Sequence, residues 1–300
     1  MLRNYTGPIF IIIAATLWAF DGLIRQHLYT LPPLIIIFLE HLIGLAILTP
    51  FVWKNLRGNN FTKKDYGLLI LIAILSGLLG TLWFTAALGK VHFITLSVVF
   101  LLQKLQPIFA ITSATIFLKE RFERGYIIWA ILALISAYFV TFKNGVVNLE
   151  TGEGTAIAAL YALGAAFAWG TSTTFSKMLL GRVSAKVSTF YRFLFTVIIA
   201  LPVVFLFGYG PSLTAPTGTQ FAWLALIAVS TGMVALLIYY KGLARTPVHI
   251  STILELTFPF IAIILDMLVN DVTLSVTQWL AALLLVFSIY RISRLREGSL

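Results

Sequence analysis

Ten apolar runs, each long enough to cross a lipid bilayer, constrain this 300-residue chain more than any other feature. They cover residues 7–26, 33–53, 66–88, 96–118, 125–142, 154–177, 187–208, 220–241, 249–269 and 276–292. The runs show no alternation of period two and are too long for barrel strands, so each predicts a membrane-spanning helix. The first run has no small-residue cleavage site, so we expect it to be kept as a span. We therefore predict an all-α polytopic membrane protein.

The composition excludes several classes of protein. Apolar residues make up 60% of the chain and charged residues 11%, too few polar groups to cover a soluble fold. There is no cysteine, and the four histidines lie far apart in the sequence, so we expect neither disulfides nor a metal site. No Ser–His pair or phosphate-binding glycine loop occurs, which disfavours an intramembrane enzyme and predicts no cofactor.

The net charge of +10 is spread unevenly along the chain. With a cytoplasmic N-terminus, sixteen Lys and Arg fall in cytoplasmic segments, against three outside, Arg25, Lys90 and Lys143. Positive charge on cytoplasmic loops is the usual rule, so we predict a bacterial-type inner-membrane protein with both termini cytoplasmic. The expected partners are the bilayer and a small-molecule solute, with protons as an alternative coupling ion. Nucleic acid is not expected, and no obligate protein partner is evident.

The two halves of the chain repeat each other. The segment LWAFDGLIRQ (17–26) corresponds to AWGTSTTFSK (168–177), which aligns Trp18 with Trp169. An offset of 152 residues relates FLEHL (38–42) to FYRFL (190–194), Gly80 to Gly232, and Pro107 to Pro259. Each half has five spans, an odd number, so the second half enters the membrane from the opposite side. This inverted repeat is typical of secondary transporters. We place the repeats at 1–148 and 149–300, in one membrane domain.

Ten helices in two sets of five, together with FTAAL…LLQKLQPIFAITSATIFLKERF (84–122) and AWGTSTTFSK, form a pattern that covers nearly the whole chain. This pattern resembles the EamA branch of the drug/metabolite transporter superfamily, which includes YddG-type aromatic amino acid exporters. The resemblance implies a basket of ten helices around a central cavity lined mainly by helices 1, 3, 4, 6, 8 and 9. The chain departs from the family in helix 1, where WAFD replaces Trp-Gly, and at VNDVTL (269–274), which stands where the first half has an acidic turn.

Ionisable side chains within the spans mark candidate functional positions, because each costs roughly 2.5–3.5 kcal/mol at helix centre without a partner or water. These residues are Asp21, Glu40, Lys104, Arg192, Glu255 and Asp266. The repeat relates Glu40 to Arg192 and brings Lys104 close to the equivalent of Glu255. We therefore predict two gating pairs, Glu40–Lys104 outside and Arg192–Glu255 inside. The alternative is that Lys104 and Arg192 extend to the nearest interface and anchor their helices.

Pro107 and Pro259 lie near the middle of their predicted spans. An interior proline frees the carbonyl four residues earlier, here those of Gln103 and Glu255. Such backbone is tolerated in a bilayer where it lines a wet cavity, which predicts two helix breaks at the substrate site. A plain packing kink is the alternative.

Aromatic and small polar residues indicate the substrate site. Trp18, Asp21 and Arg25 share one face of the first helix, and Trp169 and Ser172 recur in the second half. A Trp beside polar groups suits a flat apolar or aromatic solute, with the acid available for an amino group or a proton. The alternative is an aromatic packing face with Asp21 paired to Arg25. The predicted substrate-binding residues are Trp18, Asp21, Trp83, Gln103, Gln106, Trp169, Ser172, Tyr239 and Glu255.

These observations predict a secondary transporter that works by alternating access. The expected solutes are small amphipathic metabolites, neutral or aromatic amino acids, and the expected direction is export. The alternative is a proton-coupled exporter of cationic drugs, with Asp21 as the proton site. The chain has no ATP-binding sequence, which excludes a self-contained primary pump.

Overall fold

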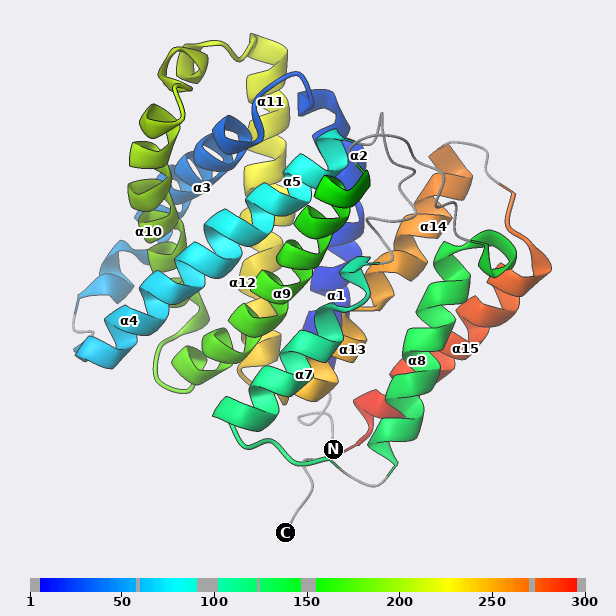
Figure 1. Cartoon of the computed structure of the whole chain (residues 1–300). Coiled ribbons are helices and arrows are strands. Elements are labelled where there is room, and N and C mark those ends of the chain that lie inside the picture. Colours follow the sequence, from blue (N-terminus) through cyan, green and yellow to red (C-terminus); the bar gives the residue numbers. More distant parts are fainter. Residues whose placement is uncertain are drawn as a thin grey trace.

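The computed structural model describes residues 6–57, 60–90, 102–122, 125–146, 155–269 and 273–295, and its regular structure in these ranges is helical (Figure 1). The first half contains α1 (Thr6–Ala19), α2 (Asp21–Arg25), α3 (Pro33–Leu56), α4 (Lys63–Ile72), α5 (Thr81–Gly89), α7 (Gln106–Phe117) and α8 (Tyr126–Thr141). The second half contains α9 (Thr155–Leu180), α10 (Ala185–Leu206), α11 (Gly218–Ile227), α12 (Ala235–Leu243), α13 (Val248–Leu254), α14 (Thr257–Val269) and α15 (Val276–Ser293). Residues 96–101 of the predicted fourth span and the side chain of Asp266 lie outside the described part.

The prediction of an all-helical polytopic membrane protein is confirmed. Eight helical stretches of the described chain are long and apolar enough to cross a membrane, and α7 and α8 are shorter apolar helices. Outward-facing side chains on the peripheral helices are large and apolar. Ile128 on α8 is 61% exposed and Leu283 on α15 is 68% exposed, as expected for helices that contact lipid.

The two halves pack against each other reciprocally. The second spans, α3 and α10, contact each other, and so do the fifth spans, α8 and α15. The first span of one half, α1, packs on α12 and α14, the third and fourth spans of the other half. In the same way α9 packs on α5 and α7. The inner helices therefore come from both halves, and neither half encloses the interior alone.

The third spans of both halves are interrupted at equivalent positions. α4 continues as the π-helical segment η3 (Ala73–Gly80), and α11 continues as η6 (Ala228–Val234). Both spans begin with a capping box, made by Thr62 in the first half and by Thr217, 155 residues later, in the second. In this register Gly77, not the predicted Gly80, is equivalent to Gly232. π-helical segments shift the backbone hydrogen bonds and are frequent at functional sites.

The fourth spans of both halves are broken just before a proline. The chain turns at residues 104–105 before α7 and at residues 255–256 before α14. Pro107 lies in the first turn of α7, and Pro259 is the third residue of α14. The prediction that the Glu255 carbonyl is free is wrong, because this carbonyl accepts the Phe258 N–H at 2.9 Å within the turn. The break itself therefore satisfies this carbonyl and leaves the Glu255 side chain to point into the bundle.

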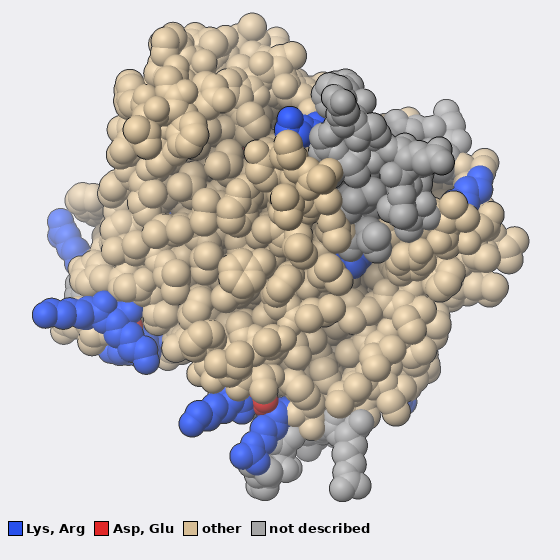
Figure 2. All heavy atoms as spheres, in the orientation of Figure 1, with Lys and Arg blue, Asp and Glu red and all other residues tan. Residues whose placement is uncertain are grey.

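Lys and Arg gather at one end of the bundle, where α4 begins (Figure 2). Arg25 was predicted to lie outside the membrane, but it is only 4% exposed and belongs to the interior. Removing it from the outer loops strengthens the charge bias on which the predicted orientation rests.

This orientation can be tested because the chain has no cysteine. Asn60 and Ala215 are both exposed, in the loops before α4 and α11. A single cysteine at Asn60 should react with an impermeant maleimide only after cells are permeabilised, whereas one at Ala215 should react in intact cells. Ala215 is preferable to Thr217, which caps α11. Equal labelling of both positions in intact cells would contradict the orientation.

The acidic turn of the first half caps a helix of the second half. Glu120, in the loop after α7, accepts the backbone N–H groups of Val248 at 2.8 Å and His249 at 3.1 Å, at the start of α13. It also contacts the His249 ring. Burial raises the pKa of Glu120, but the hydrogen bonds from His249 and Val248 outweigh it, and the net pKa is lowered. A carboxylate at a helix N-terminus is also stabilised by the helix dipole.

The lowered pKa of Glu120 predicts a pH-dependent contribution to stability. Because the folded-state pKa lies below the unfolded value of about 4.3, the contribution is complete above that value and is lost as the pH falls through the folded pKa. Thermal unfolding in detergent should show Glu120→Gln less stable than wild type at neutral pH, with the gap closing in acid. A gap that stays constant down to a pH of about 3 would contradict this role of the charge.

Candidate functional site

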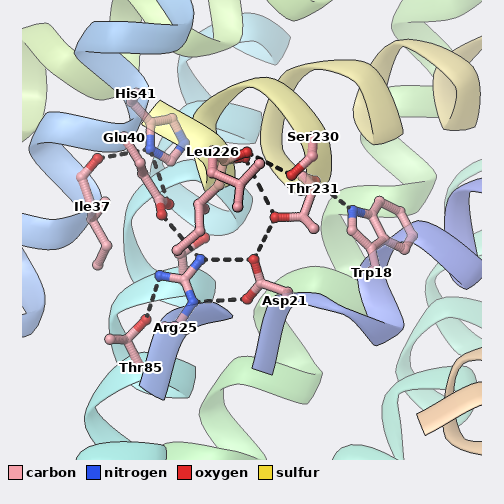
Figure 3. Close-up of polar contacts among 12 residues, drawn as sticks. Trp18, Asp21, Arg25, Ile37, Glu40, His41, Thr85, Leu226, Ser230 and Thr231 are labelled. Atoms are coloured by element: carbon pink, nitrogen blue, oxygen red, sulfur yellow. Dashed lines mark hydrogen bonds and ion pairs between the residues drawn. The ribbon is translucent and has the colours of Figure 1, made fainter. Parts of the chain in front are cut away.

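A buried guanidinium organises the polar centre of the first half (Figure 3). Arg25 donates Nε to Asp21 Oδ2 at 2.8 Å and Nη2 to Glu40 Oε2 at 3.0 Å. Asp21 and Arg25 are the first and last residues of α2, and Glu40 comes from α3. Arg25 and Glu40 are 4% and 7% exposed. A buried charge is stable only when an opposite charge or hydrogen-bond partner is near, and here the carboxylates of Asp21 and Glu40 share the guanidinium of Arg25.

Uncharged neighbours complete this centre. Thr231 of η6 donates its hydroxyl to Asp21 Oδ1 at 2.6 Å, and Arg25 Nη1 donates to the Thr85 hydroxyl of α5 at 3.4 Å. His41 Nδ1 lies 3.5 Å from Glu40 Oε1. Thr85, Thr231 and His41 were not predicted as site residues, because nothing in the spacing of a threonine or histidine within an apolar span distinguishes a functional position. Only the register of the folded helices brings them together.

The predicted outer pair, Glu40–Lys104, is not formed. Glu40 binds Arg25, while Lys104 has no carboxylate within 4 Å among the described residues. The physical reason is local: Arg25 ends α2 and Glu40 is the eighth residue of the next long helix, α3, so the two residues that meet are only 15 positions apart in the chain. The Asp21–Arg25 pair, which was the alternative for helix 1, is present.

A second polar centre lies at the breaks of the fourth and ninth spans. Glu255, on the turn before α14, accepts the Tyr239 hydroxyl at 2.6 Å and Gln106 Nε2 at 3.0 Å. Tyr239 belongs to α12, and Gln106 begins α7. Thr173 of α9 lies 3.4 Å from the Tyr239 hydroxyl. The Trp18 ring contacts the Tyr239 ring at 5.0 Å between centroids and so links this centre to the first.

The predicted inner pair, Arg192–Glu255, is not formed in this structure either. Both oxygens of Glu255 already accept hydrogen bonds from Tyr239 and Gln106. Arg192 Nη1 instead donates to the Tyr240 hydroxyl at 3.5 Å, and its Nε is buried without a hydrogen-bond partner among the described residues. The neutral donors Tyr239 and Gln106 therefore bind the Glu255 carboxylate, for which the prediction had Arg192 as the partner.

The two repeat-related tryptophans each bind the π-helical segment of the opposite half. Trp18 Nε1 donates to the Thr231 carbonyl in η6 at 3.0 Å, and Trp169 Nε1 donates to the Ser76 carbonyl in η3 at 3.2 Å. Gly80 permits the second contact, since a Cβ there would lie 2.5 Å from the Trp169 ring. Each indole therefore supplies a donor where the helical hydrogen bonding is shifted.

The remaining predicted site residues lie at helix packing surfaces. Trp83 of α5 packs on Gly164 of α9, where a Cβ would come within 2.8 Å of the ring. Ser172 of α9 is 2% exposed. Trp83 therefore lies in the contact between α5 and α9, and Ser172 is buried on α9.

The arrangement offers aromatic faces and hydrogen-bond donors, with little free acid. Asp21, Glu40 and Glu255 all have protein partners. Six buried side-chain groups have no hydrogen-bond partner among the described residues: Gln103 Nε2, Arg192 Nε and the hydroxyls of Ser136, Ser188, Thr246 and Thr252. Lys104 has no carboxylate within 4 Å in the same part of the chain. The described residues contain no group of three His, Asp, Glu or Cys that could hold a metal ion. A neutral solute rich in acceptors suits such a site better than a cationic amine.

The indole N–H groups can be tested separately from the rings. Trp18→Phe and Trp169→Phe keep an aromatic ring but leave a buried carbonyl without its donor, at a cost of about 1–3 kcal/mol each. Both variants should unfold in detergent at a lower temperature than wild type. Trp53→Phe, at a position 55% exposed, is the matched control and should not change the unfolding temperature. Wild-type stability in both interior variants would show that the two hydrogen bonds contribute nothing.

Comparison with known proteins gives consistent similarities. The sequence profile of the EamA-like transporter family matches residues 5–142 and 156–294. The chain is 37% identical over 301 residues to the riboflavin transporter ImpX of Fusobacterium nucleatum, covering 98% of this chain and 100% of that protein. It is 24% identical over 244 residues to the uncharacterized transporter sll1164 of Synechocystis, covering 78% and 67% of the two chains. A protein crystal structure 18% identical in sequence shares the fold, with a TM-score of 0.78 over 97% of this chain and 99% of that one.

Proposed function

Since this chain belongs to the EamA-like transporter family, whose members are secondary transporters and not enzymes, we propose that it carries riboflavin across a bacterial-type inner membrane. The observation that carries this proposal is the 37% identity with a riboflavin transporter along the full length of both chains. The proposed orientation, with both termini cytoplasmic, is supported by the Lys and Arg bias.

The chemistry of the two polar centres supports a flavin. Riboflavin is uncharged at neutral pH and combines a flat tricyclic ring with a chain of hydroxyls. Trp18 and Tyr239 offer aromatic faces, and Thr173, Gln106 and Glu255 offer hydrogen-bonding groups beside them. Stacking and a small number of polar contacts are the usual means of binding such a molecule.

The solute proposed here is a flavin and not the amino acid predicted from the sequence. A free carboxylate would favour the positive charge of an amino acid or a cationic drug. Asp21, the residue predicted for that purpose, is held by Arg25 and Thr231. The sequence predicted an amphipathic metabolite and a tryptophan face suited to a flat apolar or aromatic solute, and riboflavin has both properties without a positive charge.

Alternating access follows from the reciprocal packing of the halves. One set of helices consists of α1, α12 and α14, and the other of α9, α5 and α7. In our proposal the two sets rock against each other and open the interior to alternate sides of the membrane. The broken spans before α7 and α14 place Gln106 and Glu255 where the two sets meet. We propose that solute binds there and that the riboflavin gradient sets the net direction of transport.

Counterflow in proteoliposomes tests this function. Purified protein in vesicles loaded with unlabelled riboflavin should take up radiolabelled riboflavin saturably, whereas protein-free vesicles should not. Excess lumiflavin, which keeps the ring but lacks the ribityl chain, should compete. Excess tryptophan or phenylalanine should have no effect. Uptake driven by aromatic amino acids, with none driven by riboflavin, would overturn the proposal and restore the amino acid prediction.

A further inference from the structure

Two adjacent donors at the break of the fourth span lack protein partners. Gln103 Nε2 is buried and makes no hydrogen bond among the described residues. Lys104, the next residue, has no carboxylate within 4 Å in the described part of the chain. The acids at the site are already engaged, since Glu255 holds Tyr239 and Gln106, and Glu40 holds Arg25. A buried donor without an acceptor is costly, so an acceptor from outside the protein is the expected partner.

These donors belong to the same connected centre as the aromatic rings. Gln106, three residues after Gln103 and on the other side of the break, binds Glu255, and Glu255 binds the Tyr239 hydroxyl. The Tyr239 ring in turn contacts Trp18. Gln103 and Lys104 stand three and two residues before Gln106 in the chain, so they lie at the same break as the group that leads to this aromatic pair. Broken helices at a repeat interface are where such transporters hold solute.

We propose that Gln103 and Lys104 recognise the pyrimidine edge of the flavin ring, an inference that rests on the proposed function. This edge carries the C2 carbonyl, the N3–H and the C4 carbonyl, in the order acceptor, donor, acceptor. The Gln103 amide presents a donor and an acceptor side by side, which match one carbonyl and the N3–H. The Lys104 ammonium supplies a further donor for a carbonyl oxygen. The ribityl chain makes no contact with this pair.

Analogues that alter one edge at a time test the assignment in the counterflow assay. N3-methylriboflavin blocks the N3–H and crowds both carbonyls, while lumiflavin leaves the edge intact. Wild-type protein should bind N3-methylriboflavin about tenfold more weakly than riboflavin. In Gln103→Leu, riboflavin should weaken by about tenfold and the difference between the two compounds should close. Lys104→Met should weaken riboflavin and lumiflavin by the same factor, because both carry the edge.

Two controls keep the outcomes distinct. Gln26→Leu, at an exposed position, should preserve wild-type affinity and discrimination. Gln103→Glu keeps the side-chain size and replaces the donor by an acceptor, so it should also lose discrimination even if Gln103→Leu folds poorly. Riboflavin transport with full discrimination in the Gln103 variants would overturn this inference and leave the proposed function intact. Absence of riboflavin transport by the wild-type protein would overturn both.

Discussion

Backbone hydrogen bonding in a medium without water is the constraint on which this structure depends. Regular helices satisfy their own backbone hydrogen bonds in lipid, but the described spans also contain two π-helical segments and breaks before α2, α7 and α14. Trp169 binds a carbonyl in η3 and Trp18 binds one in η6. The break before α14 turns Glu255 toward Gln106 of α7. Each irregularity is therefore supported by the opposite half, and the polar interior exists only when the halves are assembled.

The inverted repeat is symmetric in backbone and asymmetric in charge. Trp18 and Trp169 make equivalent contacts, yet Asp21 and Arg25 of the first half stand where the second has Ser172 and Ser176. Ser176 makes a hydrogen bond of 3.1 Å to the Tyr240 hydroxyl and carries no charge. The first half thus contributes buried ion pairs at these positions, and the second half contributes neutral hydrogen bonds. Since removing one member of a buried ion pair costs about 3–5 kcal/mol, the two halves are stabilised at these positions by different means.

The same distribution of charge connects the fold with the solute. The interior carboxylates already have protein partners: Arg25 for Glu40, and Tyr239 and Gln106 for Glu255. The groups that remain for a ligand are therefore aromatic rings and hydrogen-bond donors. A transporter for cations would need the opposite balance. Family membership gives the transport activity, and this balance of groups fits the flavin that we propose as the solute.

The linear pattern alone determined the spans, the repeat and the positions of the breaks before α7 and α14, because hydropathy, charge bias and proline act over short stretches of chain. It also identified nearly every ionisable residue of the interior, since a charge in an apolar run stands out by itself. The pairing of those charges was decided only by the tertiary structure. Glu40 pairs with Arg25 and not with Lys104. Glu255 accepts hydrogen bonds from Tyr239 and Gln106 and does not pair with Arg192. A carboxylate binds whichever donor the crossing helices bring within about 3 Å, and that depends on how neighbouring helices pack, which sequence spacing does not encode.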